Sequence, residues 1–373
     1  MEQTEPKHYV ILQPGLSDSV IDALTAQYGE ENIIPASIAK FVDKEEFTEG
    51  FPFNRDEFEK NKEKFKGNII TIVQSTGEPC SENLFYAKLA ADVAKRAGAK
   101  IVNGVFPYQA WMRQEKDELE IGRFSSMANP MIAKELKAAG FDHVTLFTPH
   151  SEEGINQYKQ VFGNNFAYVN ATKVFIDQIK KQFPNLDDIV IGAPDGLDKP
   201  DDQGQKRAED IAKALFGDDY KNHMFGIQKK RRGPGKSEIV RFEGNVKGKT
   251  AIVVDDMIST GGTMVHAAEE LKKQGADKVV IASIHGILAN GLPELLRHRD
   301  ANDNFFIDNI MISNTLPVEQ KIRAGKFELP GILKRVQVMD ISSYIIQAIE
   351  EVKQKTNQMP EPYRIVKAAP CHY

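Results

Sequence analysis

The stretch VVDDMISTGGTM, residues 253–264, joins the end of an apolar strand to the start of an amphipathic helix. Its glycines allow a tight turn that leaves backbone amides facing outward, and the dipole of the following helix points its positive end at the same place. Amides of this kind at a helix N-terminus bind phosphate groups. The turn therefore predicts a phosphate cradle, to which we assign Ser259, Thr260, Gly261, Gly262 and Thr263.

Two adjacent carboxylates, Asp255 and Asp256, come just before that turn. Neighbouring carboxylates repel each other, so the pair needs a function in the folded chain. Carboxylates accept hydrogen bonds from a sugar diol or hold hydrated Mg²⁺. A phosphate cradle beside a diol acceptor indicates ribose 5-phosphate recognition. The alternative is an ordinary strand, turn and helix in which an Asp caps the helix.

Apolar strands alternate with amphipathic helices on both sides of this stretch. The alternation predicts an α/β fold of two similar domains, each a largely parallel sheet flanked by helices. We place the first domain at residues 1–168, the second at 169–355 and an extended tail at 356–373. The expected strands include 68–74, 100–106, 143–147, 188–193, 223–228, 250–254, 278–284 and 309–313, and the expected helices 82–97, 130–139, 171–182, 205–216 and 262–274.

The composition narrows the class of function. A net charge of −5 and a pI near 6.0 argue against a general nucleic-acid binder, which usually carries a basic face. The sequence has no apolar run of about 18 residues and no apolar signal core at its amino terminus. Cys80 and Cys371 fit neither a disulfide framework nor a zinc spacing. We expect a cytoplasmic protein with small-molecule partners, without a nucleic-acid or membrane partner.

With these residues in place, the loop at 253–264 resembles the phosphoribosyl-diphosphate loop of the type I phosphoribosyltransferase fold. The chain is similar to the ribose-phosphate diphosphokinases, or PRPP synthetases, whose loop usually reads V-D-D-M-I-D-T-G-G-T. The resemblance covers residues 66–350. The other matching blocks are IVQSTGEPCSENL at 72–84, FPYQAWMRQEK at 106–116, TPHS at 148–151, APDG at 193–196, IQKKRRGPGKSEIV at 227–240 and SNTLP at 313–317.

The resemblance implies transfer of the terminal diphosphate of Mg-ATP to the C1 hydroxyl of ribose 5-phosphate, giving 5-phosphoribosyl 1-diphosphate and AMP. It also implies a homo-oligomer, either a dimer or a hexamer. Asp255 and Asp256 would hold the ribose hydroxyls or associated Mg²⁺, with the 5-phosphate in the cradle. The other implied roles are ATP binding by Arg113, Gln114, Glu115 and Lys116, Mg²⁺ binding by His150 and Asp195, and catalysis by Lys229, Arg231 and His150.

Several departures from the family pattern leave the acceptor open. Ser259 replaces the usual Asp of the cradle, Trp111 and Met112 precede Arg113 as extra side chains, and region 41–66 is altered where the family binds adenine. One alternative is the same chemistry on an esterified ribose 5-phosphate such as ADP-ribose. The others are a catalytically silent regulatory relative and a phosphoribosyltransferase that consumes the activated sugar.

Overall fold

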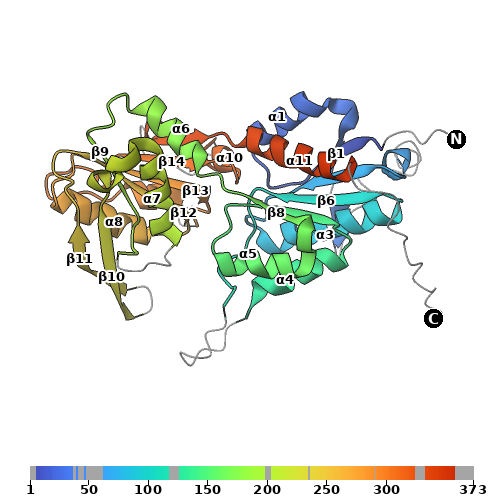
Figure 1. The fold of residues 1–373 in the computed structure, drawn as a ribbon, viewed down its shortest axis with the longest axis horizontal. Coiled ribbons are helices and arrows are strands. Elements are labelled where there is room, and N and C mark those ends of the chain that lie inside the picture. The colour runs from blue at the N-terminus through green and yellow to red at the C-terminus, as the bar shows by residue number, and fades with distance from the viewer. Residues whose placement is uncertain are drawn as a thin grey trace.

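The computed structural model describes residues 6–36, 39–40, 46–47, 62–116, 126–197, 203–233, 236–289, 291–323 and 332–357. Two parallel sheets, each flanked by helices, form an amino-terminal and a carboxyl-terminal half that lie side by side (Figure 1). This arrangement confirms the predicted α/β class.

The amino-terminal sheet has six strands, and every pair of neighbours in it is parallel. Its central strands are apolar because helices cover both faces, and all five residues of β5 are buried. The strand order is β2 (Ile33–Pro35), β1 (His8–Leu12), β5 (Ile69–Val73), β6 (Ile101–Phe106), β7 (His143–Phe147) and β8 (Phe166–Val169). The accompanying helices are α1 (Asp18–Tyr28), α3 (Cys80–Arg96), α4 (Ala128–Ala138) and α5 (Glu152–Phe162).

The carboxyl-terminal sheet is also parallel throughout, and an antiparallel hairpin stands beside it. The sheet order is β15 (Val336–Met339), β14 (Asn309–Ser313), β13 (Lys278–Gly286), β12 (Thr250–Ile258) and β9 (Ile189–Gly192), and the hairpin is β10 (Gly226–Gly233) with β11 (Lys236–Glu243). The helices are α6 (Lys173–Gln182), α7 (Gln203–Phe216), α8 (Gly262–Lys273), α9 (Gly291–Leu296) and α10 (Val318–Arg323).

Short elements complete the described chain. The two-residue strands β3 (Ala39–Lys40) and β4 (Glu46–Phe47) pair with each other in antiparallel fashion. β4 belongs to the altered region 41–66, of which residues 41–45 and 48–61 lie outside the described part of the chain. The 3₁₀ helices are Glu30–Asn32, Gly163–Asn165, Gly217–His223 and Ile332–Arg335.

The last helix, α11 (Ser342–Asn357), follows the second sheet but returns to the first half, where it packs on α1 (Figure 1). The Tyr28 hydroxyl donates to Glu350 at 2.9 Å, and Ile345 and Ile349 join a buried apolar cluster that runs through both halves. Helix α11 also covers residues 356 and 357, which were predicted as extended tail, and residues 358–373 lie outside the described chain.

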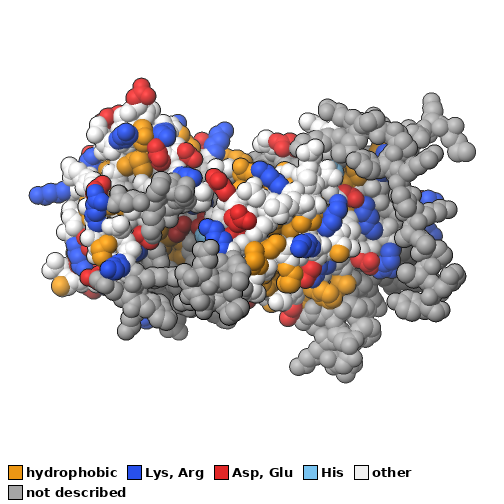
Figure 2. All heavy atoms as spheres, turned by 60° about the horizontal axis from the view of Figure 1, so that its bottom comes forward, with side chains coloured by type: hydrophobic (Ala, Val, Ile, Leu, Met, Phe, Trp, Pro, Cys, Tyr) orange, Lys and Arg blue, Asp and Glu red, His pale blue; other side chains and the backbone are white. Residues whose placement is uncertain are grey.

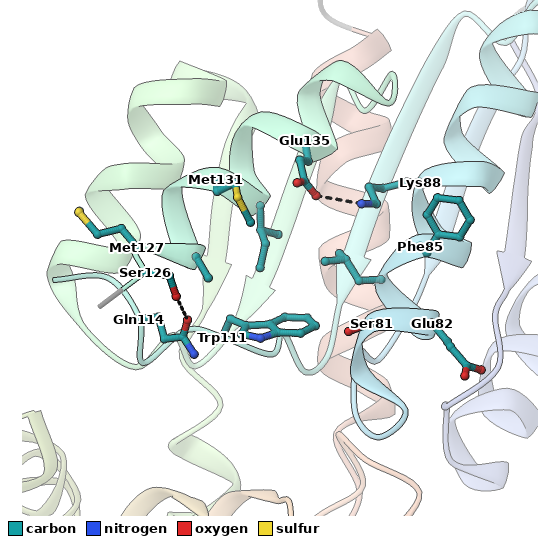
Figure 3. A pocket seen from close by; sticks show the side chains of 13 residues that line it. Ser81, Glu82, Phe85, Lys88, Trp111, Gln114, Ser126, Met127, Met131 and Glu135 are labelled. Carbon is teal, nitrogen blue, oxygen red and sulfur yellow. Dashed lines mark hydrogen bonds and ion pairs between the residues drawn. The ribbon is translucent and has the colours of Figure 1, made fainter. Parts of the chain in front are cut away.

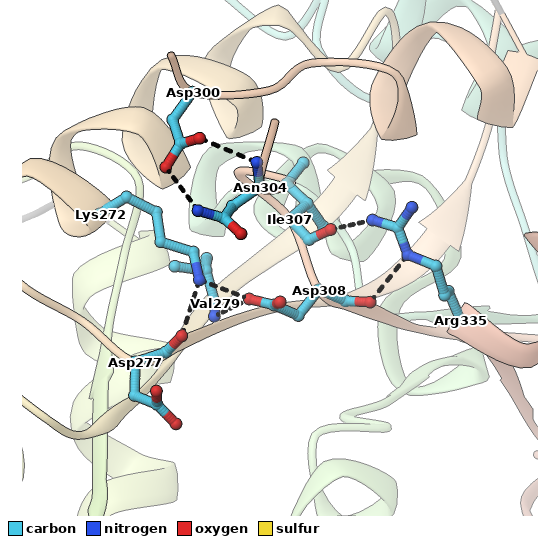
Figure 4. Close-up of polar contacts among 8 residues, drawn as sticks. All are labelled: Lys272, Asp277, Val279, Asp300, Asn304, Ile307, Asp308 and Arg335. Carbon is cyan, nitrogen blue, oxygen red and sulfur yellow. Dashed lines mark hydrogen bonds and ion pairs between the residues drawn. The ribbon is translucent and has the colours of Figure 1, made fainter. Parts of the chain in front are cut away.

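Polar contacts fix the amino ends of the strands in the second sheet (Figure 4). The Asp308 carboxylate accepts from Val279 N at 2.8 Å and from Lys272 Nζ at 2.9 Å. Arg335 donates to the carbonyls of Asp308 and Ile307. These contacts hold the segment before β14 against its neighbours at the amino ends of the strands, whereas the predicted cradle lies beyond the carboxyl end of β12.

Acidic and basic side chains are interspersed on the face drawn in Figure 2, and hydrophobic side chains gather on part of the amino-terminal half. Three large hydrophobic side chains of α3 and α4 and the turn before α4 are strongly exposed: Phe85, Met127 and Met131. Within the described residues, none of the helices has the length and apolar character required to cross a bilayer.

The two halves meet at the carboxyl ends of their strands, around His285 of β13. Its Nε2 lies 3.3 Å from the carbonyl oxygen of Thr148, and its ring meets that of Tyr108 edge-on with centroids 5.1 Å apart. The Ser75 hydroxyl donates to the carbonyl of Thr315 at 2.5 Å. Burial lowers the pKa of His285 to about 4, so this ring is neutral at neutral pH.

The buried His285 should make stability depend on pH. Its pKa is lower in the folded than in the unfolded chain, so the unfolded state binds the proton first as pH falls, and stability is lost between about pH 6.5 and 4. His285→Gln removes this titration. Between about pH 7.5 and about pH 5, the wild type should lose about 2 kcal/mol more unfolding free energy than the variant. Urea titrations at both pH values measure this difference, and equal losses would contradict it.

Candidate active site

A cavity of about 430 Å³ lies at the junction of the two halves. The amino-terminal half contributes residues of the segment after β6 and of the start of α5, and the other half contributes β12, α7 and the end of β9. Seven of the predicted site residues line this cavity: Glu115, Lys116, His150, Asp195, Asp255, Asp256 and Thr263. Residues predicted to bind ATP, Mg²⁺ and ribose 5-phosphate thus lie around the same cavity.

Asp255 and Asp256 belong to β12 itself, because the strand continues to Ile258 beyond its predicted end at 254. β13 is long enough to keep pairing with it, with Asp255 opposite Ser283 and Met257 opposite His285. Successive side chains of a strand point to opposite sides, and Asp256 is buried whereas Asp255 is half-buried. The sheet therefore holds the two carboxylates more rigidly than a loop would.

His150 brings the amino-terminal half to these carboxylates. Its Nδ1 lies 2.7 Å from Asp256 Oδ2 and, since a carboxylate only accepts, Nδ1 is the donor. The residue comes from a sharp turn between β7 and α5, in which Thr148 has φ +39°. A non-glycine residue in this left-handed region costs about 1 to 3 kcal/mol, so surrounding contacts must hold it there. Ser151 then caps α5 by accepting from Gly154 N at 3.1 Å.

The charges of the cavity shift the ionisation of these groups. Burial disfavours the charged imidazole of His150, but its hydrogen bond to Asp256 and the nearby carboxylates outweigh burial and raise its pKa. Burial and the charge of Asp256 raise the pKa of Asp255. Burial acts on Asp256 as well, yet the contact with His150 lowers its pKa overall. At neutral pH, Asp256 therefore carries the negative charge that pairs with His150.

The predicted phosphate cradle is a tight turn at the start of α8. Gly261 has φ +84°, and a Cβ atom there would lie 2.7 Å from Leu295 Cδ1, so both the backbone and the packing require glycine. The exposed hydroxyls of Thr260 and Thr263 stand at the N-terminus of α8. Ser259 is half-buried on the strand side of the turn. The turn thus places the hydroxyls of Thr260 and Thr263 at the positive end of the dipole of α8, and Thr263 lines the cavity.

The hairpin reaches this site through Lys229. Its backbone amide donates to Asp195 Oδ1 and its ammonium group to the carbonyl of Thr263, both at 3.0 Å. Through its backbone amide and its side chain, Lys229 thus connects the metal-site candidate Asp195 with the cradle. The backbone of Arg231 lies in β10, paired with Ser237, but its side chain lies outside the described part of the structure.

The segment 113–116 runs between two cavities. Glu115 and Lys116 face the polar cavity, whereas Gln114 lines a second cavity of about 660 Å³ between α3 and α4. In Figure 3, the ring of Trp111 points across this second cavity, whose walls include Phe85 and Met131. Arg113 is exposed and borders neither of the two cavities.

Backbone contacts hold this segment to two helices. The Gln114 carbonyl accepts from Asn129 N at 3.2 Å, and the Glu115 carbonyl accepts from the Gln157 side chain at 2.6 Å. Met112, which we treated as an extra side chain, is buried in the core of the amino-terminal half. Residues 117–125 of the altered loop that follows lie outside the described chain.

Sequence reasoning missed Arg207. This side chain of α7 is buried, lines the polar cavity and has no carboxylate within ion-pair distance among the described residues. The available signal was its spacing, because Arg207 lies on the same helix face as Ala208, Ile211 and Ala212. An arginine on the apolar face of a helix calls for a ligand or a buried partner.

The cavity suits Mg²⁺ that arrives with phosphates. Among the described residues, no three His, Cys, Asp or Glu side chains form a cluster that would hold a metal ion by itself. Mg²⁺ commonly takes one or two protein carboxylates together with substrate phosphates and water. One carboxylate oxygen of Glu115 is buried without a hydrogen-bond partner in the described structure, beside the polar cavity. Oxygen ligands are therefore present for a metal bound to a nucleotide.

Both halves of the chain match known protein families. A family model described as the N-terminal domain of ribose phosphate pyrophosphokinase matches residues 18–140, and one described as phosphoribosyl synthetase-associated domain matches residues 219–364. Ribose-phosphate pyrophosphokinase of Aquifex aeolicus is 30% identical over 79% of this chain and 84% of its own length. The enzyme of the same name from Haemophilus ducreyi is 30% identical over 78% of this chain and 82% of its own.

The chain belongs to the ribose-phosphate pyrophosphokinase family. A crystal structure of phosphoribosylpyrophosphate synthetase from Mycobacterium smegmatis has the same fold, with a TM-score of 0.72, 24% identity and coverage of 94% of this chain and 99% of that one. The predicted family is thereby confirmed. Membership in this family does not favour an esterified acceptor, a silent regulatory relative or a phosphoribosyltransferase.

Proposed function

We propose that this family member transfers the diphosphate of Mg-ATP to the C1 hydroxyl of ribose 5-phosphate, forming 5-phosphoribosyl 1-diphosphate and AMP. The observation that carries the proposal is the single segment from Asp255 to Thr263, which presents two carboxylates and a helix N-terminus to one cavity. The cradle takes the 5-phosphate and the carboxylates take the ribose hydroxyls. The sugar is thereby oriented with its C1 hydroxyl toward the second substrate.

The transfer itself asks mainly for positioning and positive charge. The C1 oxygen attacks the β-phosphorus of ATP, the bond from that phosphorus to the α,β-bridging oxygen breaks, and AMP leaves. Lys229 lies between the cradle and Asp195, and Arg207 and Lys116 face the same cavity. Their charges offset those of the diphosphate as it moves between oxygens. We assign Arg231 to the same role from its resemblance to the family motif.

We assign Mg²⁺ to His150, Asp195 and the paired carboxylates. These residues would hold the ion when it is bound as part of Mg-ATP, where it would supply positive charge for the phosphate oxygens. His150 is held by Asp256, so a nucleotide that reaches His150 is also placed beside the ribose site. A cytoplasmic location and a homo-oligomer, as a dimer or a hexamer, are part of the proposal; the first rests on the sequence composition and the second on the family resemblance.

ATP binding is assigned to the segment 113–116. Gln114 and Glu115 are neighbours in the chain but face different cavities, one largely apolar and one polar. A nucleotide lying along this segment places its base against Trp111 and its phosphates against Lys116 and His150. Arg113 would reach the nucleotide from the exposed side.

The direct test incubates the purified protein with Mg-ATP and ribose 5-phosphate and identifies the products by mass. We expect 5-phosphoribosyl 1-diphosphate and AMP in equal amounts. ADP-ribose in place of ribose 5-phosphate should be used far more slowly. Absence of AMP, or consumption of added 5-phosphoribosyl 1-diphosphate, would contradict the proposed function.

Arg207 should matter far more than its neighbour Lys206, although both line the polar cavity. Arg207 is buried there, whereas Lys206 is only half-buried and its Nζ lies 3.9 Å from Glu152 Oε1. Arg207→Met should lower kcat by about 100-fold because a fixed charge on the transferring phosphates is lost. Lys206→Met should lower kcat by less than about fivefold. Steady-state assays of the matched pair measure this, and similar effects of both changes would refute the role of Arg207.

Trp111→Ala should weaken ATP binding selectively. Loss of a base-stacking ring should raise KM for ATP by about tenfold and leave KM for ribose 5-phosphate unchanged. Tyr168→Ala is the matched control, because Tyr168 is an exposed aromatic residue on β8, away from both cavities. Initial-rate kinetics with each substrate varied in turn provide the measurement. An unchanged KM for ATP would place the base elsewhere.

A further inference from the structure

His285 lies outside the groups assigned to substrates, yet it is a buried titratable residue near the site. Its side chain is only 3% exposed and sits at the carboxyl end of β13, opposite Met257 of β12. Its contacts come from both halves: Thr315 of the carboxyl-terminal half, and Thr148 and Tyr108 of the other. A buried imidazole in this place connects the two sheets that form the cavity.

The hydrogen bonds of His285 fix its protonation at each nitrogen. Nε2 faces the carbonyl oxygen of Thr148 at 3.3 Å, and a carbonyl only accepts, so Nε2 carries the proton. Nδ1, 3.1 Å from Thr315 Oγ1, is then the acceptor. The Thr315 hydroxyl also lies 3.1 Å from the carbonyl oxygen of Ile284, but the Ser313 hydroxyl donates to that carbonyl at the shorter distance of 2.6 Å, so the Thr315 proton is assigned to the bond with Nδ1. The lowered pKa agrees with this neutral form.

The acceptor of this bond is the strained residue of the turn. Thr148 has φ +39°, and its amide and hydroxyl are already engaged with Val169 and Ala171. His285 supplies the hydrogen bond to the remaining polar group, the carbonyl. That carbonyl precedes Pro149 and His150, so its direction sets where the imidazole of His150 emerges.

We propose that His285 is a positioning residue of this site, whose Nε2–H holds the left-handed turn at Thr148 and thereby keeps His150 on Asp256 across the junction of the two halves. The proposal rests on the proposed function for its kinetic consequence. Its structural consequence, the His150–Asp256 contact, can be observed whatever the protein catalyses.

Two halves of the site should respond differently to loss of this bond. The carboxylates and the phosphate cradle lie on one strand, turn and helix of the carboxyl-terminal half, so ribose 5-phosphate keeps its contacts. His150 comes from the other half and loses its fixed position. We therefore expect kcat to fall while KM for ribose 5-phosphate stays the same.

The test compares His285→Gln with His285→Met. The two side chains have the same length, and the Gln amide nitrogen stands as many bonds from Cα as Nε2 does, so only Gln can donate to Thr148. His285→Met should lower kcat by at least about tenfold, and His285→Gln should keep it within about threefold of wild type. Equal losses in both variants, or a rise in KM for ribose 5-phosphate that accounts for the loss, would overturn the proposal.

Crystal structures of both variants provide the measurement that is independent of activity. In His285→Met, the turn at Thr148 should leave the left-handed region and His150 should move beyond hydrogen-bond distance of Asp256. In His285→Gln, both features should remain. An unchanged turn and an unchanged His150–Asp256 contact in the Met variant would overturn the positioning role, whatever the protein catalyses. Failure of the wild type to form 5-phosphoribosyl 1-diphosphate would reject only the proposed function. If the Met variant does not fold, His285→Asn, whose shorter amide reaches Thr315 but not Thr148, takes its place with the same expectations.

Discussion

The hydrogen bond from His150 to Asp256 joins two halves of the chain at the point where the candidate chemistry occurs. Each partner depends on its own half: Asp256 on the pairing of β12 with β13, and His150 on a strained turn after β7. A contact of 2.7 Å tolerates little relative motion, so the junction must be rigid. The buried cluster that runs through both halves, the return of α11 onto α1 and the interdomain bonds of His285 and Ser75 meet that requirement.

Local patterns in the sequence predicted most of the sheets. The run HVTLF became β7 with the same bounds, because an apolar run buried on both faces has few alternatives. The end of β12 was wrong by four residues, since the polar pair Asp255 and Asp256 does not look like strand although β13 continues to pair with it. The expected strand 223–228 overlaps the start of β10, but the rest of the hairpin was missed because a basic run hides its alternation. The return of α11 depends on long-range packing that no local pattern encodes.

In the site, too, residues of one local motif could be predicted from the sequence, whereas residues that depend on distant neighbours could not. Residues of the compact motif from Asp255 to Thr263 were predicted together, and three of them, Asp255, Asp256 and Thr263, line the cavity. Arg207 was not predicted because it lies among the polar residues of QGQKRAED, and His285 was not predicted because it is a single polar residue in an apolar strand. For Trp111, the sequence indicated a departure from the family pattern, and the structure adds that its ring borders a separate cavity.

The charge of the polar cavity constrains which ligand can enter it. Six carboxylates line it against Lys116, Lys206, Arg207 and His150, so the wall alone does not favour a polyanion. Several of these carboxylates are buried near one another, where repulsion is strong, and the rise in the pKa of Asp255 is one consequence. A metal-bound nucleotide brings the missing positive charge with it. Ser259 in place of the usual Asp removes one further negative charge, and this lowers the repulsion that the sugar phosphate meets at the cradle.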